Sequence, residues 1–395
     1  MIKTLSALVL VALIFSSCRR EAREQQDGFV QIGKKDIIHS NVLNEDRPFQ
    51  VYVPPYVIGS GKKFPVLYLL DGDAHFHSVS GLIQILGTGI NGTNVVPEMI
   101  VVAIPNTDRT RDLTPSHSQT MRGRTEDFLK TSGGGDNFLK FIETELIPRI
   151  ESEYPTHPYR VLVGHSFGGI TAINALYKKP DLFDAYISID PSLWWDQQSL
   201  LKKADSIFSS TKLENKYLYL AQANTLAPGE DTNEHFGSIV EYEKVLASPK
   251  NTSGIHWAFK YYPDDSHGSV PLISEYDGLR FIFRDFNPSY EKIGLDIVAL
   301  KKNFAQYRMS PPEGIVNRFG YVAMQQKDFD LAQQYFQMNI EAYPGSSNAY
   351  DSMGELLLNK GDTVNALTHY EKSLELDSKN DNARKVINEL LAKKK

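Results

Sequence analysis

The pentapeptide Gly164-His165-Ser166-Phe167-Gly168 contains the residue types that most directly suggest chemistry. A serine hydroxyl becomes a useful nucleophile when a nearby base takes its proton and when it projects clear of the backbone. The apolar run 159–163 predicts a buried strand, and the small-residue run 169–177 predicts a helix. An ordinary glycine-rich connection is the alternative, but a serine at a strand-to-helix turn is typical of a nucleophile elbow. Ser166 is therefore the candidate nucleophile.

The nucleophile needs a base, and His267 is the candidate. It follows the strand-like run 256–262 and precedes a predicted helix at 275–286. Acyl-transfer enzymes with an elbow place the base after the last strand of the sheet. His75 and His77 could suggest a metal pair, but no cysteine or suitable carboxylate accompanies them. We therefore expect neither a metal nor a cofactor.

An acid that orients the imidazole should lie between Ser166 and His267 in the chain, after the strand predicted at 217–220. Asp231 is our assignment. Glu230 and Glu234 lie in the same stretch and could serve equally. A serine–histidine pair without an acid is a further possibility.

The oxyanion of a tetrahedral intermediate needs backbone N–H donors. One is expected from Phe167, the residue after the nucleophile, and another from the loop that follows the predicted strand 64–70. Gly72 and Asp73 are both candidates there. We assign the second N–H to Asp73.

Two regions could shape a substrate pocket. Arg109 and Arg111 lie in the polar segment 107–135, which is predicted to be a long loop where the strands end. These arginines, with Asp112, either face substrate or pair among themselves. Trp194 and Trp195 follow a predicted strand and either stack on a planar acyl group or pack in the core.

Strand-like and helix-like runs alternate between residues 29 and 290. A strand pair at 36–43 and 49–54 is followed by apolar central strands at 64–70 and 98–104 and by an amphipathic helix at 136–154. This order predicts an α/β-hydrolase fold, with a mostly parallel sheet flanked by helices.

The N-terminal segment 1–18 reads as a secretory signal, because a basic start precedes a short apolar run. Cys18, the one cysteine in the chain, lies at the cleavage position, as in the lipobox of bacterial lipoproteins. Residues 19–28 form a polar tether. We expect an exported protein held at the cell envelope by a lipid, with a plain cleaved signal as the alternative. With a single cysteine the fold cannot depend on disulfides.

The C-terminal part shows a period of 34 residues, which resembles tetratricopeptide repeats. Residues 291–312 are predicted as a linker, and 313–395 as a small all-α domain of two repeats with a capping helix. This tail should pack against the preceding domain, since two repeats are few for independent stability. It either binds a protein partner or serves packing or dimerisation. The recurring pairs are Val316 and Tyr350, Gly320 and Gly354, Ala332 and Ala366, and Phe336 and Tyr370.

Composition supports a globular protein of 395 residues, with 41% hydrophobic and 23% charged residues. The net charge of −6, without a basic cluster, argues against nucleic acid as a partner.

Four motifs together resemble the esterase family that includes enterochelin and ferri-siderophore esterases, feruloyl esterases and esterase D. The resemblance implies hydrolysis of carboxylic esters without metal or organic cofactor, with Ser166 and His267 in the matching positions. The acid does not carry over cleanly, because members of the family differ in supplying it. The motifs are LYLLDGD at 67–73, GHSFGG at 164–169, DPSLWW at 190–195 and DDSHGSVP at 264–271.

The resulting hypothesis is a serine esterase that works through an acyl-enzyme, on siderophore, feruloyl or acetyl esters of small molecules. A serine peptidase would use the same residues, but no N-terminal gating domain of the prolyl-peptidase type is visible in the sequence. A non-catalytic scaffold that binds proteins through its repeats is the alternative from another class.

Overall fold

The computed structural model describes residues 30–55, 62–87, 94–121 and 123–392. The predicted signal, Cys18 and the tether lie outside the described residues.

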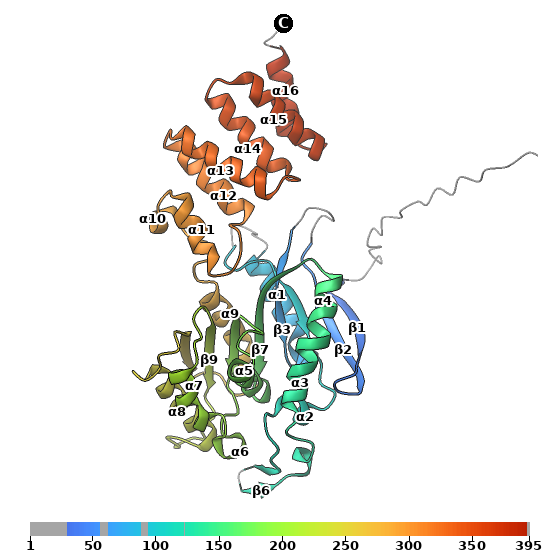
Figure 1. Cartoon of the computed structure of the whole chain (residues 1–395), viewed down its shortest axis with the longest axis vertical. Coiled ribbons are helices and arrows are strands. Elements are labelled where there is room, and N and C mark those ends of the chain that lie inside the picture. Colours follow the sequence, from blue (N-terminus) through green and yellow to red (C-terminus); the bar gives the residue numbers. More distant parts are fainter. Residues whose placement is uncertain (1–29, 56–61, 88–93, 122, 393–395) are drawn as a thin grey trace, which may run out of the picture. The chain divides into compact units, whose positions relative to one another are not determined.

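An eight-stranded sheet forms the centre of the fold (Figure 1), in the order β1-β2-β4-β3-β7-β8-β9-β10. The first two strands pair antiparallel with each other, and β2 pairs antiparallel with β4. All other neighbours are parallel. The strands are β1 (Lys34–Ser40), β2 (Glu45–Tyr52), β3 (Phe64–Leu69), β4 (Ile100–Ala103), β7 (Thr156–His165), β8 (Ala185–Ile189), β9 (Tyr217–Ala223) and β10 (His256–Tyr262).

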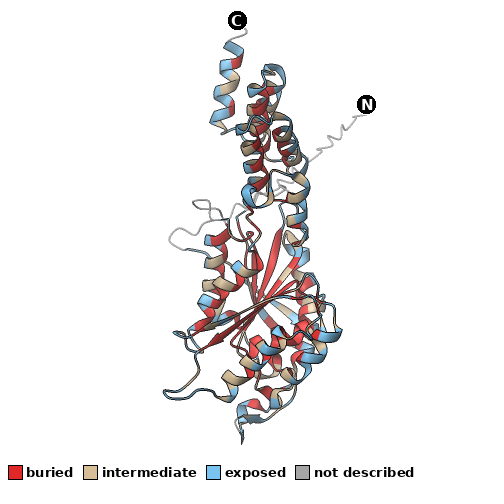
Figure 2. Cartoon of the chain, turned by 90° about the vertical axis from the view of Figure 1, so that its left-hand side faces the viewer, coloured by how far each residue is buried: buried red, intermediate tan, exposed pale blue. Residues whose placement is uncertain are grey.

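Side chains of the central strands alternate between two apolar layers, as the pleat of a strand requires. Leu67 and Leu69 face a layer that includes α1 (Gly72–Gly87) and α9 (Val270–Ile282). Val66 and Tyr68 face the opposite layer. Figure 2 shows the strands of this sheet as mostly buried. The second layer is built on α3 (Gly135–Phe141), η3 (Ile142–Leu146), α4 (Ile147–Glu153), α5 (Phe167–Lys178), α7 (Leu201–Ser210) and α8 (Glu234–Ala247).

This architecture matches the α/β-hydrolase prediction. The helix expected at 136–154 is present, but a π-helical turn divides it into α3, η3 and α4. The segment 107–135, expected as a loop, contains short elements. They are α2 (Arg109–Leu113), β5 (Thr120–Met121), β6 (Arg124–Thr125) and η2 (Asp127–Leu129).

Residues 291–312, predicted as a linker, are partly helical. They contain most of α10 (Tyr290–Ile293) and all of α11 (Ile297–Ala305). The ring of Phe304 packs edge-on against Phe286, and Tyr307 contacts Phe283. Arg308 donates to the Asp184 carboxylate at 2.6 Å. Aromatic packing therefore joins this segment to the end of the preceding α/β unit.

The C-terminal region is entirely helical from α12 to α16 in the residues described. A side chain would be crowded at the two repeat positions, because a Cβ on Gly320 would lie 2.5 Å from the Phe336 ring and one on Gly354 would lie 3.0 Å from the Tyr370 ring. None of the helices in the described ranges has the length and apolar character needed to span a bilayer. The helices of this region are α12 (Glu313–Gln325), α13 (Phe329–Ala342), α14 (Ser347–Asn359), α15 (Thr363–Leu376) and α16 (Asp381–Ala392).

Candidate active site

Ser166 occupies a strained turn between β7 and α5, with φ 60° and ψ −112°. Such a conformation is costly for a residue with a side chain and is typical of functional sites. Gly164 allows the turn, because a Cβ there would lie 2.2 Å from the carbonyl oxygen of Gly168. The turn is held by the Ser166 N–H, which donates to the Ile189 carbonyl at 2.9 Å. The hydroxyl is thereby raised at the carboxyl end of the sheet.

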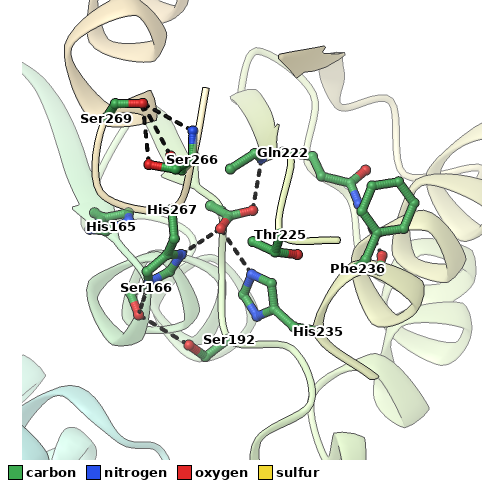
Figure 3. A network of polar contacts seen from close by, with 12 residues as sticks. His165, Ser166, Ser192, Gln222, Thr225, His235, Phe236, Ser266, His267 and Ser269 are labelled. Carbon is green, nitrogen blue, oxygen red and sulfur yellow. Dashed lines mark hydrogen bonds and ion pairs between the residues drawn. The ribbon is translucent and has the colours of Figure 1, made fainter. Parts of the chain in front are cut away.

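His267 lies on the turn between β10 and α9, and its Nε2 is 3.1 Å from the Ser166 Oγ (Figure 3). Two hydrogen bonds to and from the Ser269 hydroxyl stabilise the turn that carries His267: it accepts from the Ser266 N–H and donates to the Asp265 carboxylate. The structure therefore brings together the two residues that the sequence pattern selected, although 101 positions separate them.

The acid beside His267 is Asp190, and Asp231 does not occupy this position. The Asp190 Oδ2 is 2.5 Å from the His267 Nδ1, whereas Glu230, Asp231 and Glu234 are exposed and form no hydrogen bond or ion pair with the ring. Asp190 directly follows β8, one strand earlier than we expected. The sequence does contain a signal for Asp190, because it is an aspartate that immediately follows β8, the strand that pairs with β7 before Ser166.

Asp190 is fully buried, and this burial opposes its ionisation. Hydrogen bonds from His235 and His267 and from the Ala223 N–H outweigh it and hold the pKa of the carboxyl well below its usual range. His165 packs its ring 4.4 Å from that of His267. Burial and the neighbouring His267 lower the pKa of His165 to about 4, so it stays neutral beside the base at physiological pH.

Two backbone N–H groups are candidates for an oxyanion hole. The N–H groups of Phe167 and Asp73 lie in the first turns of α5 and α1, where helices leave donors unpaired. Among the described residues neither N–H has an acceptor, whereas the Gly72 N–H donates to the Ile104 carbonyl at 3.0 Å. Of the two alternatives after β3, Asp73 is thus the one with a free donor.

Arg109 contacts both chain neighbours of Ser166, His165 and Phe167. Its Nε and Nη2 bind the Asp71 carboxylate at 2.6 and 3.0 Å, and Nη2 also reaches the His165 carbonyl at 3.3 Å. The guanidinium lies over the Phe167 ring, 5.4 Å from its centroid. In the described part of the chain Nη1 has no partner, so one donor remains for a ligand.

Arg111 is engaged elsewhere. It binds the carboxylates of Glu45 and Asp112, and Asp112 in turn pairs with the buried Arg47 at 2.6 Å. Glu45, Arg47, Arg111 and Asp112 form an ion-pair network between β2 and α2. Of the two arginines that the sequence suggested for a substrate pocket, Arg109 therefore lies next to the Ser166 turn, whereas Arg111 belongs to the ion-pair network.

Trp194 and Trp195 lie in different surroundings. Trp195 is buried, and its indole N–H donates to the Ser116 carbonyl at 3.2 Å. Trp194 is half-buried, and its ring centroid lies 6.2 Å from that of Phe167. Trp194 is therefore the one with a surface available beside the elbow.

Asp190, His235 and His267 are the described residues that could together hold a metal, since their donor atoms lie within 4.8 Å of one another. The two imidazole nitrogens are 2.9 and 2.5 Å from the same oxygen of Asp190, which are hydrogen-bond distances. A metal ion there would have to displace both protons. His75 and His77 do not converge on a ligand set: His77 is exposed, and His75 lies 3.4 Å from Glu275.

Glu275 is a buried carboxyl group on α9, and burial raises its pKa to about 8 although a hydrogen bond from Ser78 acts against this. Burial also lowers the pKa of His75. The contact between them therefore joins two neutral groups near pH 7 rather than an ion pair.

The Glu275→Gln variant should lose the pH dependence that this carboxyl imposes on stability. The folded chain keeps a proton that the unfolded chain releases above the ordinary pKa of 4.5, so wild-type stability falls as the pH rises from 4.5 to about 8. We expect the variant to be more stable than wild type at pH 8, by on the order of a few kcal/mol. Urea unfolding at pH 5 and 8 measures this, with the exposed Glu371→Gln as control. Equal pH dependence in all three proteins would contradict it.

Comparison with known proteins places the chain in a family. Residues 40–226 match the family model described as "Putative esterase". The chain is 30% identical to ferri-bacillibactin esterase BesA of Bacillus subtilis over 264 residues, which cover 62% of this chain and 88% of that protein. The chain belongs to this esterase family.

The esterase is also 32% identical to a siderophore enterobactin esterase of Emericella nidulans over 166 residues, covering 39% of this chain and 54% of the relative. An IroE-like serine hydrolase from Shewanella oneidensis matches its structure with a TM-score of 0.69 and 31% identity, over 78% of this chain and 99% of that one. The predicted fold and the predicted activity, carboxylic-ester hydrolysis, are confirmed. The peptidase and scaffold alternatives gain no support.

Proposed function

We propose that the esterase hydrolyses siderophore esters, with Ser166 as nucleophile, His267 as base and Asp190 as the acid that orients the base. The observation that carries the proposal is the hydrogen-bonded chain from the Ser166 Oγ through His267 to Asp190. The names of two relatives, a ferri-bacillibactin esterase and a siderophore enterobactin esterase, supply the substrate class.

The reaction begins when the Ser166 Oγ attacks the ester carbonyl carbon while the His267 Nε2 takes the hydroxyl proton. The negative charge that develops on the carbonyl oxygen is stabilised by the N–H groups of Phe167 and Asp73. Buried Asp190 stabilises the imidazolium. His267 then gives its proton to the departing alcohol, leaving an acyl-enzyme. A water molecule, deprotonated by the His267 Nε2, then attacks the acyl carbon. The bond between that carbon and the Ser166 Oγ breaks, His267 returns the proton to Oγ, and the carboxylic acid leaves.

Exposure and charge at the site favour a bulky substrate with anionic or polar substituents. The His267 side chain is 43% exposed, so the base is open to a large ester. Arg109 offers its free Nη1 next to Phe167, and the half-buried Trp194 presents an aromatic ring for a planar acyl group.

A substrate panel tests this proposal with the full chain. The panel contains a catecholate siderophore triester, feruloylated and acetylated sugars, p-nitrophenyl acetate and an unstructured peptide. We expect the highest kcat/KM on the siderophore triester and no peptide cleavage. A higher kcat/KM on the sugar esters would contradict siderophore esters as the substrate class but would leave the proposed ester hydrolysis intact.

Arg109→Lys should weaken recognition of the siderophore without impairing hydrolysis of a small neutral ester. Lysine keeps a positive charge beside Asp71, but its single nitrogen cannot both bind Asp71 and replace the free Nη1 of the guanidinium. Loss of one charge-assisted hydrogen bond should raise KM for the siderophore by about tenfold. Steady-state kinetics with p-nitrophenyl acetate, expected to change less than about twofold, is the control. A uniform loss on both substrates would instead assign Arg109 to the reaction chemistry.

The proposal extends to the two ends of the chain, Cys18 and the C-terminal helices. Export with lipid attachment at Cys18 would hold the enzyme at the cell envelope. Mass spectrometry of the N-terminal peptide from the native membrane fraction tests this. The repeats of the C-terminal region would offer a surface for a protein partner.

A further inference from the structure

His235 is a second imidazole on the carboxylate that orients the catalytic base. We propose that His235 is a positioning residue of the reaction: its donation to Asp190 fixes the carboxylate in the orientation that receives the Nδ1–H of His267. The inference rests on the proposed function and adds to it a residue that the catalytic chain of Ser166, His267 and Asp190 does not contain.

The Asp190 carboxylate accepts three hydrogen bonds. Its Oδ1 accepts from the Ala223 N–H at 2.9 Å, and its Oδ2 accepts from both His235 Nε2 at 2.9 Å and His267 Nδ1 at 2.5 Å. Because an ionised carboxylate only accepts, each nitrogen facing it carries a proton. This sets the tautomer of both rings.

The two rings approach the carboxylate from different directions. Their planes are perpendicular, at 90°, and their centroids lie 5.4 Å apart. Asp190 stands at φ 39°, in a bend where no solvent reaches it. With only the Ala223 N–H and the His267 Nδ1–H as donors, the orientation of the carboxylate plane would depend on the ring that must also exchange a proton with Ser166. The donor from His235 gives Oδ2 a partner that takes no part in proton transfer.

Hydrogen bonds at the start of α8 fix the backbone that carries His235. The residue is the second of α8, and the preceding Asn233 caps that helix by accepting from the Phe236 N–H at 2.9 Å. The Asn233 amide also donates to the Thr225 carbonyl at 2.8 Å. Gln222, on β9, donates to the Phe236 carbonyl at 3.0 Å. The His235 side chain is only 11% exposed, so it is largely confined.

Four neighbouring parallel strands thus contribute one residue each to the same place. Ser166 follows β7, Asp190 follows β8, His235 comes from the connection after β9, and His267 follows β10. The connection after β9 is where the sequence predicted the acid. In this structure it supplies the residue that holds the acid.

The test compares His235→Ala with His235→Gln in the full chain. Glutamine can place its amide N–H near the position of the imidazole Nε2, whereas alanine leaves Oδ2 without this donor. We expect kcat on p-nitrophenyl acetate to fall by about tenfold to a hundredfold in the alanine variant, with KM unchanged, since a misplaced base slows the chemical step. The glutamine variant should recover to within a few fold. His256→Ala, on the outer strand β10, is the matched control.

Proton NMR gives a readout that a general loss of packing would not move. The short His267–Asp190 hydrogen bond should give a far-downfield proton resonance, shifted in the alanine variant and restored by glutamine. If His235→Ala does not fold, His235→Asn replaces it, because its amide is too short to reach Asp190 and the same loss is expected.

Three results would overturn the inference. These are wild-type kcat in the alanine variant, equal losses with alanine and glutamine, and activity abolished by EDTA and restored by Zn²⁺, which would assign Asp190, His235 and His267 to a metal. Ser166→Ala separates this from the proposed function. Activity surviving in Ser166→Ala refutes the nucleophile itself, whereas an inactive Ser166→Ala beside a fully active His235→Ala refutes only the role of His235.

Discussion

Replacing Ser166 by alanine is expected to lower kcat by about a hundred-thousandfold to a millionfold, because no other described hydroxyl contacts the His267 Nε2. Without the Oγ no acyl-enzyme forms, and only the binding and oxyanion contributions remain. Hydrolysis of p-nitrophenyl acetate, together with covalent labelling by a fluorophosphonate probe, measures this. Thermal unfolding should match wild type, since the hydroxyl makes only contacts within the site.

Ser192→Ala is the matched control for the nucleophile. Its hydroxyl lies 3.2 Å from that of Ser166 but does not contact His267. We expect the variant to retain probe labelling and to lose less than about tenfold in kcat. Labelling that persists in Ser166→Ala and disappears in Ser192→Ala would transfer the role of nucleophile to the neighbouring serine.

Asp190→Asn is expected to lower kcat on the order of ten-thousandfold with the fold retained. The asparagine amide can present an N–H to His267, which favours the tautomer that cannot accept the serine proton, and it removes the charge that stabilises the imidazolium. Steady-state kinetics over a pH series measures the loss. Circular dichroism checks that the buried site still folds.

Asp231→Asn separates the acid found in the structure from the acid expected from the sequence. Asp231 is exposed, so its substitution should leave kcat within about twofold of wild type. A severe loss in Asp231→Asn with little change in Asp190→Asn would mean that the loop after β9 closes over His267 during the reaction and that Asp190 has only a structural role.

The strands and the elbow could be predicted because their signals are local. Apolar runs such as 185–189 and 256–262 coincide with β8 and β10, and a serine between glycines at the end of such a run is informative by itself. His267 could be selected because this fold places the base after the last strand, and the structure brings its Nε2 to 3.1 Å from the Ser166 Oγ. Helical structure in α10 and α11 was missed, although Ile297, Leu300 and Phe304 recur at helical spacing in α11. Both helices are short, and Phe304 and Tyr307 pack against the preceding α/β unit.

The acid was missed because its place depends on strand register. In the pairing of β7 with β8, His165 lies opposite Ile189, so the next residues, Ser166 and Asp190, leave the sheet side by side. A rule based on chain order alone put the acid one strand later. The division between Arg109 and Arg111 has the same origin, since both lie in one short helix and only packing decides which carboxylate each one meets.

By itself the sequence indicated the α/β sheet and a serine at a strand-to-helix turn, because hydrophobic periodicity and turn chemistry act between residues close in the chain. The ester-hydrolase activity was implied by the resemblance of its motifs to the esterase family, and Ser166 and His267 are the proposed nucleophile and base. Tertiary structure alone decided that Asp190 faces His267, that His235 shares the same carboxylate oxygen and that Arg109 contacts both chain neighbours of Ser166. These are contacts between side chains from separate strands and helices, and their distances follow from how the sheet aligns those elements.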